Sequence, residues 1–327
     1  MVEFEVLVLP GANPSGVAMT RDILSVAASA ARRLALPIPT FGFFSVDGGA
    51  VALQGGMQID TRRLPQRRRA TGSVLLIPGL WVQNRHELAA QIVKEPCQQA
   101  IEAIGAHVRR GGMVTATCSA VFLLHAAGVL DGRAATTTWW LAPALSAVAA
   151  KTRVEAQRVL CADGPVITAG APMAQSDVLL YLLRVRHGAA LADQVARLLL
   201  LQERTEQTSF VMPGLIAVGN PLIGALTQRI EAALPEVPSV SQLAKEQHMS
   251  ERTLARKVTR ASGMSPVALI QSIRLQRARQ LLQSSRKSIE QIAHAVGYRD
   301  ATALRRLVAK TVGLTPNALR RQRRLST

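Results

Sequence analysis

The chain has 327 residues, of which 48% are apolar and 3% are aromatic, and it carries a formal net charge of +18. This length is enough for two domains of ordinary size with sizeable cores. The positive charge indicates a polyanionic partner, whereas the scarcity of aromatic residues disfavours a stacking platform for single-stranded nucleic acid. The charge is concentrated near one end, because residues 235–327 hold 18 Lys and Arg against 5 Asp and Glu.

The three cysteines, Cys97, Cys118 and Cys161, cannot all pair, and their spacing fits no zinc motif. The N-terminal MVEFEVLVLP is too short an apolar run and too acidic for a signal peptide. No uninterrupted apolar run reaches the roughly 18 residues of a transmembrane helix. We therefore expect reduced thiols, a cytoplasmic location, no metal, no cofactor and no membrane contact.

The first two hundred residues alternate between short apolar runs and longer amphipathic runs. The expected strands are Phe4–Leu9, Thr40–Val46, Ser73–Ile77, Met113–Thr117 and Val166–Ala169. The expected helices are Val17–Leu34, Glu87–Lys94, Pro96–Arg109, Ser119–Ala127, Leu141–Lys151 and Ala174–His187. This alternation is typical of βαβ units and of a parallel sheet covered on both faces.

These patterns predict a two-domain chain. We expect a mainly parallel, flavodoxin-like α/β domain over residues 1–201, a linker over 202–216 and an all-α domain over 217–327. Ligands of such sheets bind beyond the carboxyl ends of the strands, and Cys118 follows one of those ends. The arginine-rich segment 62–69 is interpreted as a solvated loop.

The C-terminal part contains an approximate internal repeat. SGMSPVAL (262–269) matches VGLTPNAL (312–319) at an offset of 50 residues, and SVSQLA (239–244) matches SIEQIA (288–293) at an offset of 49. The second copy therefore carries one extra residue, near Gly297–Asp300. Each copy starts with a Ser-x-x-Gln capping box and is expected to form a short helix, a tight turn and a second helix.

The second helix of each copy begins after a good N-cap, Ser250 or Asp300, and combines an apolar stripe with a basic face. This is the arrangement of a helix-turn-helix unit, whose recognition helix enters the major groove of double-stranded DNA. We predict two such units, at about residues 239–261 and 288–312, joined by a helix over Pro266–Gln283. The predicted DNA-binding residues are Ser250, Arg252, Thr253, Arg256, Lys257, Arg260, Arg299, Thr302, Arg305, Arg306 and Lys310.

Residues 219–322 resemble the DNA-binding domain of AraC/XylS-type transcriptional regulators. The segment 251–282 is similar to the first recognition helix and the linker helix of that family, and 288–320 is similar to its second unit. The chain has Ala303-Leu304 where the family has a polar residue followed by Phe, so we expect the second helix to contact phosphates more than bases. The resemblance implies a homodimer on DNA and is compatible with a contact between the protein and RNA polymerase.

The segment GMVTATCSAVFLLHAAG (112–128) indicates a strand, a turn bearing Cys118 and a helix from Ser119. Together with LLIPGLW (75–81) and ITAGAPMAQSDVLLYLLRVRHG (167–188), it resembles the PfpI-like class I glutamine amidotransferase-like fold. The combination with the C-terminal domain resembles the GlxA-like regulators. In catalytic relatives the elbow cysteine works with a His and a carboxylate. Here Ser119 follows the cysteine, the later turn reads TTTW without His, and the first loop has no acidic residue.

We therefore expect a domain that binds and does not catalyse. Cys118 is interpreted as a pocket-lining residue, an inert packing residue, or a catalytic or redox-sensing thiol, and the sequence leaves these roles open. Turn amides and indole rings favour a small anion or an amine. The predicted pocket residues are Gly79, Leu80, Trp81, Cys118, Ser119, Thr138 and Trp139.

Three functional hypotheses follow from these patterns. The first is a sequence-specific DNA-binding transcriptional regulator controlled by a small metabolite. The second is a cysteine-dependent amidase or glyoxalase-like enzyme that uses Cys118 and carries a DNA-binding tail. The third is an architectural DNA-binding protein that needs no ligand and shows steep salt dependence with little preference for one operator.

Overall fold

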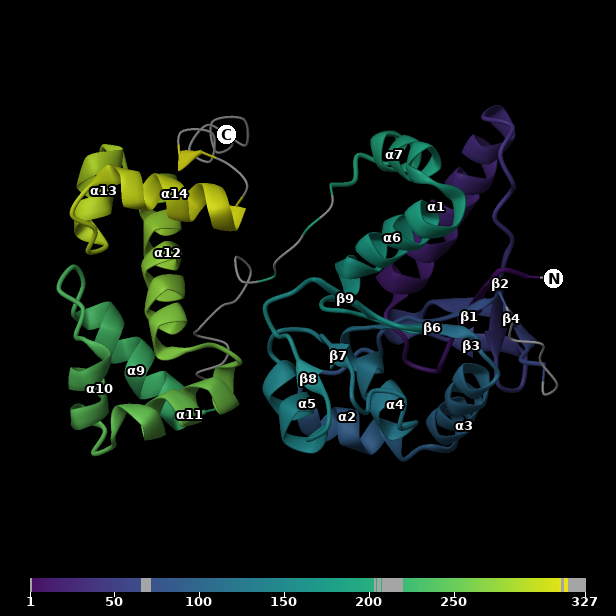
Figure 1. Ribbon diagram of the computed structural model, residues 1–327, viewed down its shortest axis with the longest axis horizontal. Coiled ribbons are helices and arrows are strands. Elements are labelled where there is room, and N and C mark those ends of the chain that lie inside the picture. The colour runs from purple at the N-terminus through teal and green to yellow at the C-terminus, as the bar shows by residue number, and fades with distance from the viewer. Residues whose placement is uncertain are drawn as a thin grey trace. The chain divides into compact units, whose positions relative to one another are not determined.

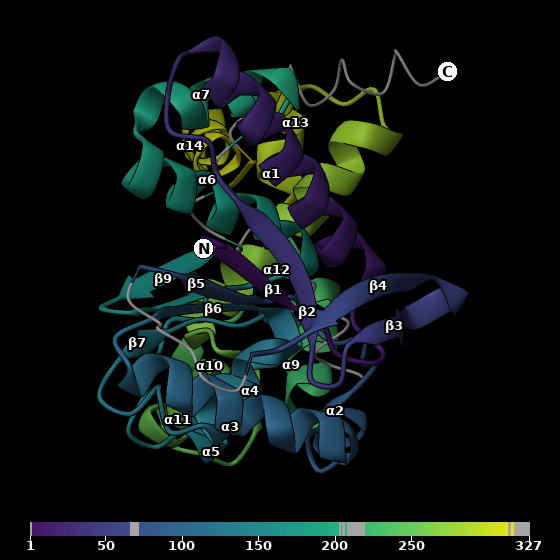
Figure 2. The same cartoon turned by 90° about the vertical axis from the view of Figure 1, so that its right-hand side faces the viewer.

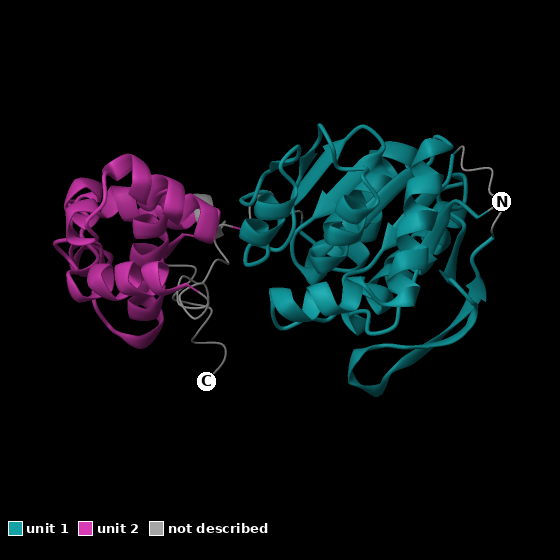
Figure 3. Ribbon diagram, turned by 90° about the horizontal axis from the view of Figure 1, so that it is seen from below, with its two compact units in different colours: residues 1–205 teal, residues 206–327 magenta. Residues whose placement is uncertain are grey.

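The computed structural model describes residues 2–65, 72–202, 204, 207, 220–312 and 315–316, with the backbone alone at 310–312. It divides the chain into two compact units, Met1–Thr205 and Glu206–Thr327 (Figure 3). Within the described residues, no helix is both long and apolar enough to cross a bilayer.

Five buried parallel strands form the centre of the first unit. Their order in the sheet is β2-β1-β5-β6-β10, which is the strand order of flavodoxin-like folds. Their bounds are β1 Phe4–Leu7, β2 Phe41–Ser45, β5 Val74–Ile77, β6 Met113–Thr117 and β10 Val166–Ala169. The predicted mainly parallel α/β sheet is confirmed, because each expected strand overlaps one of these five.

Further strands extend the sheet at both edges and were not predicted. β4 (Gln58–Arg63) lies parallel to β2, and β3 (Gly49–Ala52) pairs antiparallel with β4. At the other edge β9 (Leu160–Asp163) pairs antiparallel with β10, and β7 (Ala134–Ala135) and β8 (Arg153–Val154) form a separate short ribbon. The interpretation of residues 62–69 as a loop is wrong for Arg62 and Arg63, which belong to β4. Edge strands lack the continuous apolar run of buried ones, so their sequences resemble loops.

Helices cover both faces of the sheet (Figures 1 and 2). One layer contains α1 Pro14–Arg33, α6 Gln175–His187 and α7 Ala189–Leu198. The other contains α2 Arg85–Ile92, α3 Glu95–Arg109, α4 Val121–Ala126 and α5 Ala142–Val148. Three 3₁₀ turns complete the unit: Gln54–Gly56, Cys118–Ala120 and Pro172–Ala174.

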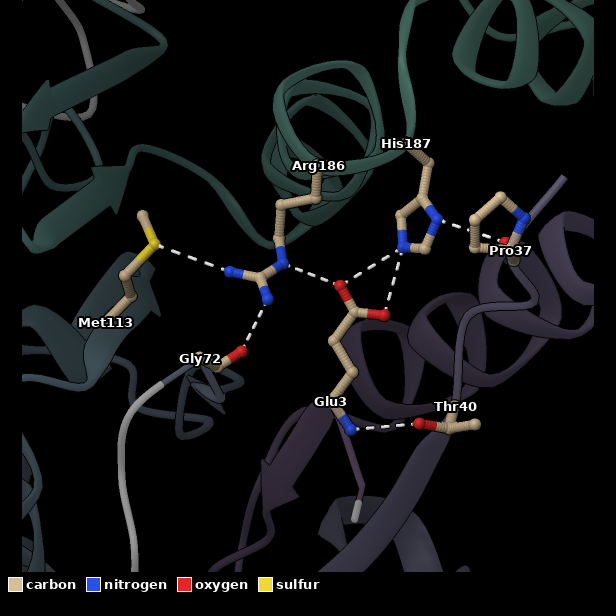
Figure 4. Close-up of polar contacts among 7 residues, drawn as sticks. All are labelled: Glu3, Pro37, Thr40, Gly72, Met113, Arg186 and His187. Atoms are coloured by element: carbon tan, nitrogen blue, oxygen red, sulfur yellow. Dashed lines mark hydrogen bonds and ion pairs between the residues drawn. The ribbon is translucent and has the colours of Figure 1, made fainter.

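A cluster of charged side chains fastens the end of α6 to the start of β1 (Figure 4). Arg186 Nε donates to Glu3 Oε1 at 2.6 Å, and Nε2 of His187 lies 3.0 Å from Glu3 Oε2. His187 Nδ1 lies 3.2 Å from the carbonyl oxygen of Pro37. The cluster stands at the amino edge of the sheet, on the side opposite the strand ends that carry Cys118, so it is structural.

The second unit is helical throughout its described residues. Its helices are α9 Pro221–Ala232, α10 Val240–Glu246, α11 Glu251–Ser262, α12 Pro266–Ser284, α13 Ile289–Ala295 and α14 Ala301–Val312. The long helix α12 runs between the pair α10–α11 and the pair α13–α14 (Figure 1). A core of apolar side chains from α12, α13 and α14 fixes the second pair on this helix.

The two pairs repeat the same local hydrogen bonding. Ser239 and Ser288 each form a complete capping box, and Ser250 caps α11 through the Thr253 N–H. The turn residues His248 and Gly297, which are equivalent in the repeat, both have a positive φ, of 53° and 86°. The equivalent backbone bonds after them, Met249 N–H to Ala244 and Tyr298 N–H to Ala293, are both 2.9 Å long. The extra residue of the second copy is therefore Arg299, which stands between this turn and the next N-cap.

Candidate functional site

The first recognition helix, α11, has one buried stripe and one exposed cationic face. Leu254 and Val258 are fully buried, which turns the intervening positions outward. The basic residues of the outward face are all exposed: Arg252, Arg256, Lys257 and Arg260. Among the described residues, none of these four side chains forms an ion pair with a carboxylate. Their charges are therefore free to meet phosphates or base edges.

The second recognition helix, α14, has fewer basic side chains without an ion pair than α11 has, among the described residues. Leu304 and Val308 are fully buried, and the exposed Arg305 donates to Glu290 Oε1 of α13 at 2.9 Å. Thr302 and Arg306 are exposed without an ion pair among the described residues, and Ala303 is half-buried. The predicted residue Lys310 has a side chain outside the described residues.

The start of α14 is capped by a carboxylate. Asp300 Oδ1 accepts hydrogen bonds from the N–H groups of Ala303 at 3.0 Å and Thr302 at 2.6 Å. These two bonds, with a smaller contribution from Arg306, hold the pKa of Asp300 below its ordinary value. The cap therefore stays ionised and keeps this end of α14 ordered, with the exposed Arg299 directly before it.

In the first unit, Cys118 occupies a tight turn directly after β6. Its φ is +53°, an uncommon value for a residue with a side chain. Gly79 lies so close that a Cβ at this position would be 2.9 Å from Cys118 Cβ. Ser119 Oγ donates to the Leu80 carbonyl at 2.6 Å, and Thr137 Oγ1 donates to the Cys118 carbonyl at 2.6 Å. The predicted pocket residues at the ends of β5 and β6 therefore come together, but they pack against one another.

The loops after β1 and β5 close over the point where the strand order reverses. The Asn13 N–H donates to the Gly79 carbonyl at 2.8 Å, and the Trp81 N–H donates to the Gly11 carbonyl at 2.9 Å. Trp81 is 49% exposed, Trp139 is half-buried and Thr138 is buried. These two bonds join the loops through the N–H groups of Asn13 and Trp81.

The expected helix at Ser119–Ala127 differs from what the structure shows. Cys118–Ala120 form a 3₁₀ turn, and α4 begins only at Val121 and has six residues. The 3₁₀ turn leads directly into α4, so Cys118 stands at the first residue of a short helical segment. The buried Ser119 side chain bonds to the Leu80 carbonyl and holds this turn in place.

The environment of Cys118 favours the neutral thiol. Burial raises its pKa to about 11, while hydrogen bonds from the backbone and side chain of Ser119 act in the opposite direction. No histidine or carboxylate contributes to this pKa, and no hydrogen bond in the described residues joins His86 or His125 to the thiol. Nucleophilic cysteines have a lowered pKa, so this turn lacks the property that its shape suggests.

We predict that Cys118 resists alkylation in the native protein. At pH 8 a thiol of pKa about 11 is ionised to roughly one part in a thousand, and the thiolate fraction grows tenfold with each pH unit until that pKa is reached. Iodoacetamide labelling, mapped by mass spectrometry, should therefore be far slower at Cys118 than for free N-acetylcysteine. Rapid labelling at pH 7.5 would show that the thiol is activated.

Two buried polar groups near this turn were missed by the sequence analysis. Gln175 accepts a hydrogen bond from Thr117 Oγ1 at 3.1 Å and donates one to Thr20 Oγ1 at 2.9 Å, so it joins β6, α6 and α1. Asp177, two residues further, is buried and bonded to Arg204. The signal in the sequence was the polar triplet Gln-Ser-Asp at the start of an otherwise apolar helix.

Comparison with known proteins assigns both units. Residues 243–322 match a helix-turn-helix domain family, and residues 86–184 match the DJ-1/PfpI family. HTH-type transcriptional regulator GbdR of Pseudomonas aeruginosa is 24% identical over 83% of this chain and 72% of its own length. HTH-type transcriptional regulator GlxA of Rhizobium meliloti is 26% identical over 84% of this chain and 83% of its own. A crystal structure of an AraC family transcriptional regulator from Pseudomonas putida aligns with 61% of this chain and 100% of that chain, at 21% identity and a TM-score of 0.48.

The fold, the cationic recognition helices and these matches define a DNA-binding transcriptional regulator with a DJ-1/PfpI-like domain. More particularly, the DJ-1/PfpI match precedes the helix-turn-helix match in the chain, and the similarity to GlxA and GbdR supports a GlxA-like regulator of the AraC family. This confirms the resemblance noted in the sequence.

Proposed function

We propose that the chain binds operator DNA through α11 and α14 as a homodimer in the cytoplasm, and that a small metabolite bound to the first unit controls this binding. The observation that carries the DNA-binding part is the face of α11, where four exposed basic side chains form no ion pair among the described residues. Because Arg305 is engaged by Glu290, we assign the greater share of base reading to α11. Contact with RNA polymerase belongs to the same proposal.

We further propose that the first unit is not an enzyme. The raised pKa of Cys118, its packing against Gly79 and the missing base support this proposal. Of the roles left open for this cysteine, inert packing at a structural turn agrees best with the contacts. The named relatives are transcriptional regulators, which points the same way.

Arg204 offers a physical connection between the first unit and the segment that follows it. Its backbone N–H donates to Asp177 Oδ1 at 2.9 Å, and its Nη2 donates to Asp177 Oδ2 and to the Met173 carbonyl, both at 2.6 Å. Met173 and Asp177 follow the carboxyl end of β10, which neighbours β6 in the sheet. We propose that this ion pair, in which Asp177 is buried and Arg204 is partly exposed, fixes where the chain leaves the first unit, so that ligand-induced shifts at this edge reach the linker.

We predict that Cys118→Ala leaves DNA binding and its response to ligand unchanged. Genome-wide footprinting of bound DNA would first supply the operator, and titration of labelled operator with the purified full-length variant should give a Kd within about twofold of the native value, because the thiol is buried inside the first unit. Amidase and deglycase assays of the native protein provide the comparison. Turnover that disappears in the variant would favour the enzyme, and equal affinity for operator and random DNA would favour the architectural binder.

A further inference from the structure

A cavity of about 570 Å³ lies at the edge of the first unit, away from the Cys118 turn. It is formed by α1, β2 and β4, and its volume is in the range of small-molecule sites. β2 and β4 pair only at Phe44–Arg62 and Ser45–Arg63, so the earlier parts of the two strands diverge. The ribbon of β3 and β4 projects from the sheet at this point (Figure 2). The cavity fills the wedge between the diverging strands and the side of α1.

The side chain of Arg62 is positioned in this wedge by packing. Its guanidinium lies over the ring of the buried Phe44, with 4.8 Å from Cζ to the ring centroid. Gly42 makes room for it, because a Cβ at this position would lie 2.2 Å from Arg62 Nη2. Among the described residues, no carboxylate forms an ion pair with Arg62. An arginine that is stacked and left with free donors is suited to bind a carboxylate in two parallel hydrogen bonds.

The other lining groups define the kind of ligand. Phe41 and Phe43 line the cavity, are both half-buried and stand edge to face at 6.2 Å between ring centroids. Arg21 of α1 adds a second positive charge, and Asp60 of β4 is the only acidic residue among the described residues that line the cavity. Two cations against one anion leave a net positive site with aromatic walls.

We propose that this cavity binds a small carboxylate with a flat apolar body, with the carboxylate held by Arg62 and the apolar body lying in the wedge beside Phe41 and Phe43. At the Cys118 turn, by contrast, the Ser119 hydroxyl is engaged by the Leu80 carbonyl and the thiol is buried. The binding itself stands on the cavity alone. That its occupant acts as the effector rests on the proposed function.

The test uses the full-length protein and isothermal titration calorimetry with benzoate, its neutral isostere benzamide, and acetate, which lacks the apolar body. Benzoate should bind more tightly than either comparison ligand. Arg62→Met keeps the apolar stem but removes the charge, and it should weaken benzoate binding by about tenfold or more, because a hydrogen-bonded charge pair is lost. Gly42→Ala, whose Cβ displaces the guanidinium, should weaken it without altering the charge. Ser119→Ala, at the Cys118 turn, should leave it unchanged.

Three results would overturn the site: no benzoate binding at millimolar concentration, equal binding of benzamide, or native affinity in both Arg62→Met and Gly42→Ala. Circular dichroism of each variant shows whether the sheet has formed, and Gly42→Ala answers the question if Arg62→Met does not fold.

Operator titration with and without benzoate separates the binding proposal from the proposal that the bound molecule regulates DNA binding. Benzoate that binds through Arg62 but leaves DNA affinity unchanged would confirm the site and count against its role in regulation. A DNA response to cellular metabolites that is lost in Ser119→Ala and kept in Arg62→Met would place the effector elsewhere and overturn the regulatory role of the cavity.

Discussion

Replacing Gly297 with alanine should destabilise the second helix-turn-helix unit by about 3 kcal/mol. The φ of this residue is +86°, where a side chain is strained. A Cβ there would also lie 2.3 Å from the carbonyl oxygen of Pro235. Because this oxygen belongs to the backbone, it cannot move aside by a change of side-chain rotamer. The backbone strain and the overlap with Pro235 add to each other. A change of φ at Gly297 that relieved either of them would break the hydrogen bond from the Tyr298 N–H to the Ala293 carbonyl.

The repeat supplies the matched control for this change. His248 is the equivalent turn residue of the first unit, it is exposed, and it already carries a side chain at a φ of +53°. His248→Ala should therefore change stability by less than about 1 kcal/mol. Urea unfolding of both variants gives the free energies, and amide hydrogen exchange of peptides from α13 and α14 shows where Gly297→Ala opens. Equal stability of the two variants would contradict the geometry of this turn.

Arg256→Ala should weaken binding to the operator by roughly ten- to a hundredfold, the value of one good contact to a base edge. Arg256 lies on the exposed face of α11 and has no acidic partner in the described residues, so the truncation removes a DNA contact without exposing a buried charge. Arg306 is its equivalent in α14, and Arg306→Ala should also weaken binding. Electrophoretic mobility shifts with operator DNA and with unrelated DNA measure both losses.

Lys257→Ala is the comparison for a phosphate contact. It should weaken operator and unrelated DNA alike and lower the slope of log K against log salt by about one unit, whereas Arg256→Ala should relax sequence preference. An unchanged mobility shift in both Arg256→Ala and Arg306→Ala would show that α11 and α14 are not the recognition helices.

The helix-turn-helix units could be predicted closely because their signals are local. A capping box, an N-cap and an apolar stripe all lie within a few residues of one another, and the repeat presents each twice. Even the extra turn residue could be placed to within four positions, and the structure assigns it to Arg299. The pairing of Arg305 with Glu290 was not predicted, because it joins two helices across 15 residues.

In the first unit, the buried central strands could be predicted from the sequence, but the edge strands could not. Continuous apolar runs such as VLLI of β5 are visible in sequence, whereas QIDTRR of β4 reads as a loop until β2 and β3 provide its hydrogen-bonding partners. The cavity beside Arg62 depends on that missed strand, so no sequence pattern pointed to it. The turn at Cys118 could be predicted from the sequence, but the burial of the thiol and its raised pKa could not.

By itself, the sequence determined the parallel α/β domain, the two helix-turn-helix units and the excess of cations on the recognition helices, because periodicity, capping and charge are encoded by neighbouring residues. Only the tertiary structure decided that the Cys118 thiol is buried with a raised pKa, that the Ser119 hydroxyl beside it is bonded to the Leu80 carbonyl, and that Arg62 stacks over Phe44 beside a cavity. These properties depend on which distant segments pack together, and burial, not residue type, sets the ionisation of a thiol and the freedom of a guanidinium.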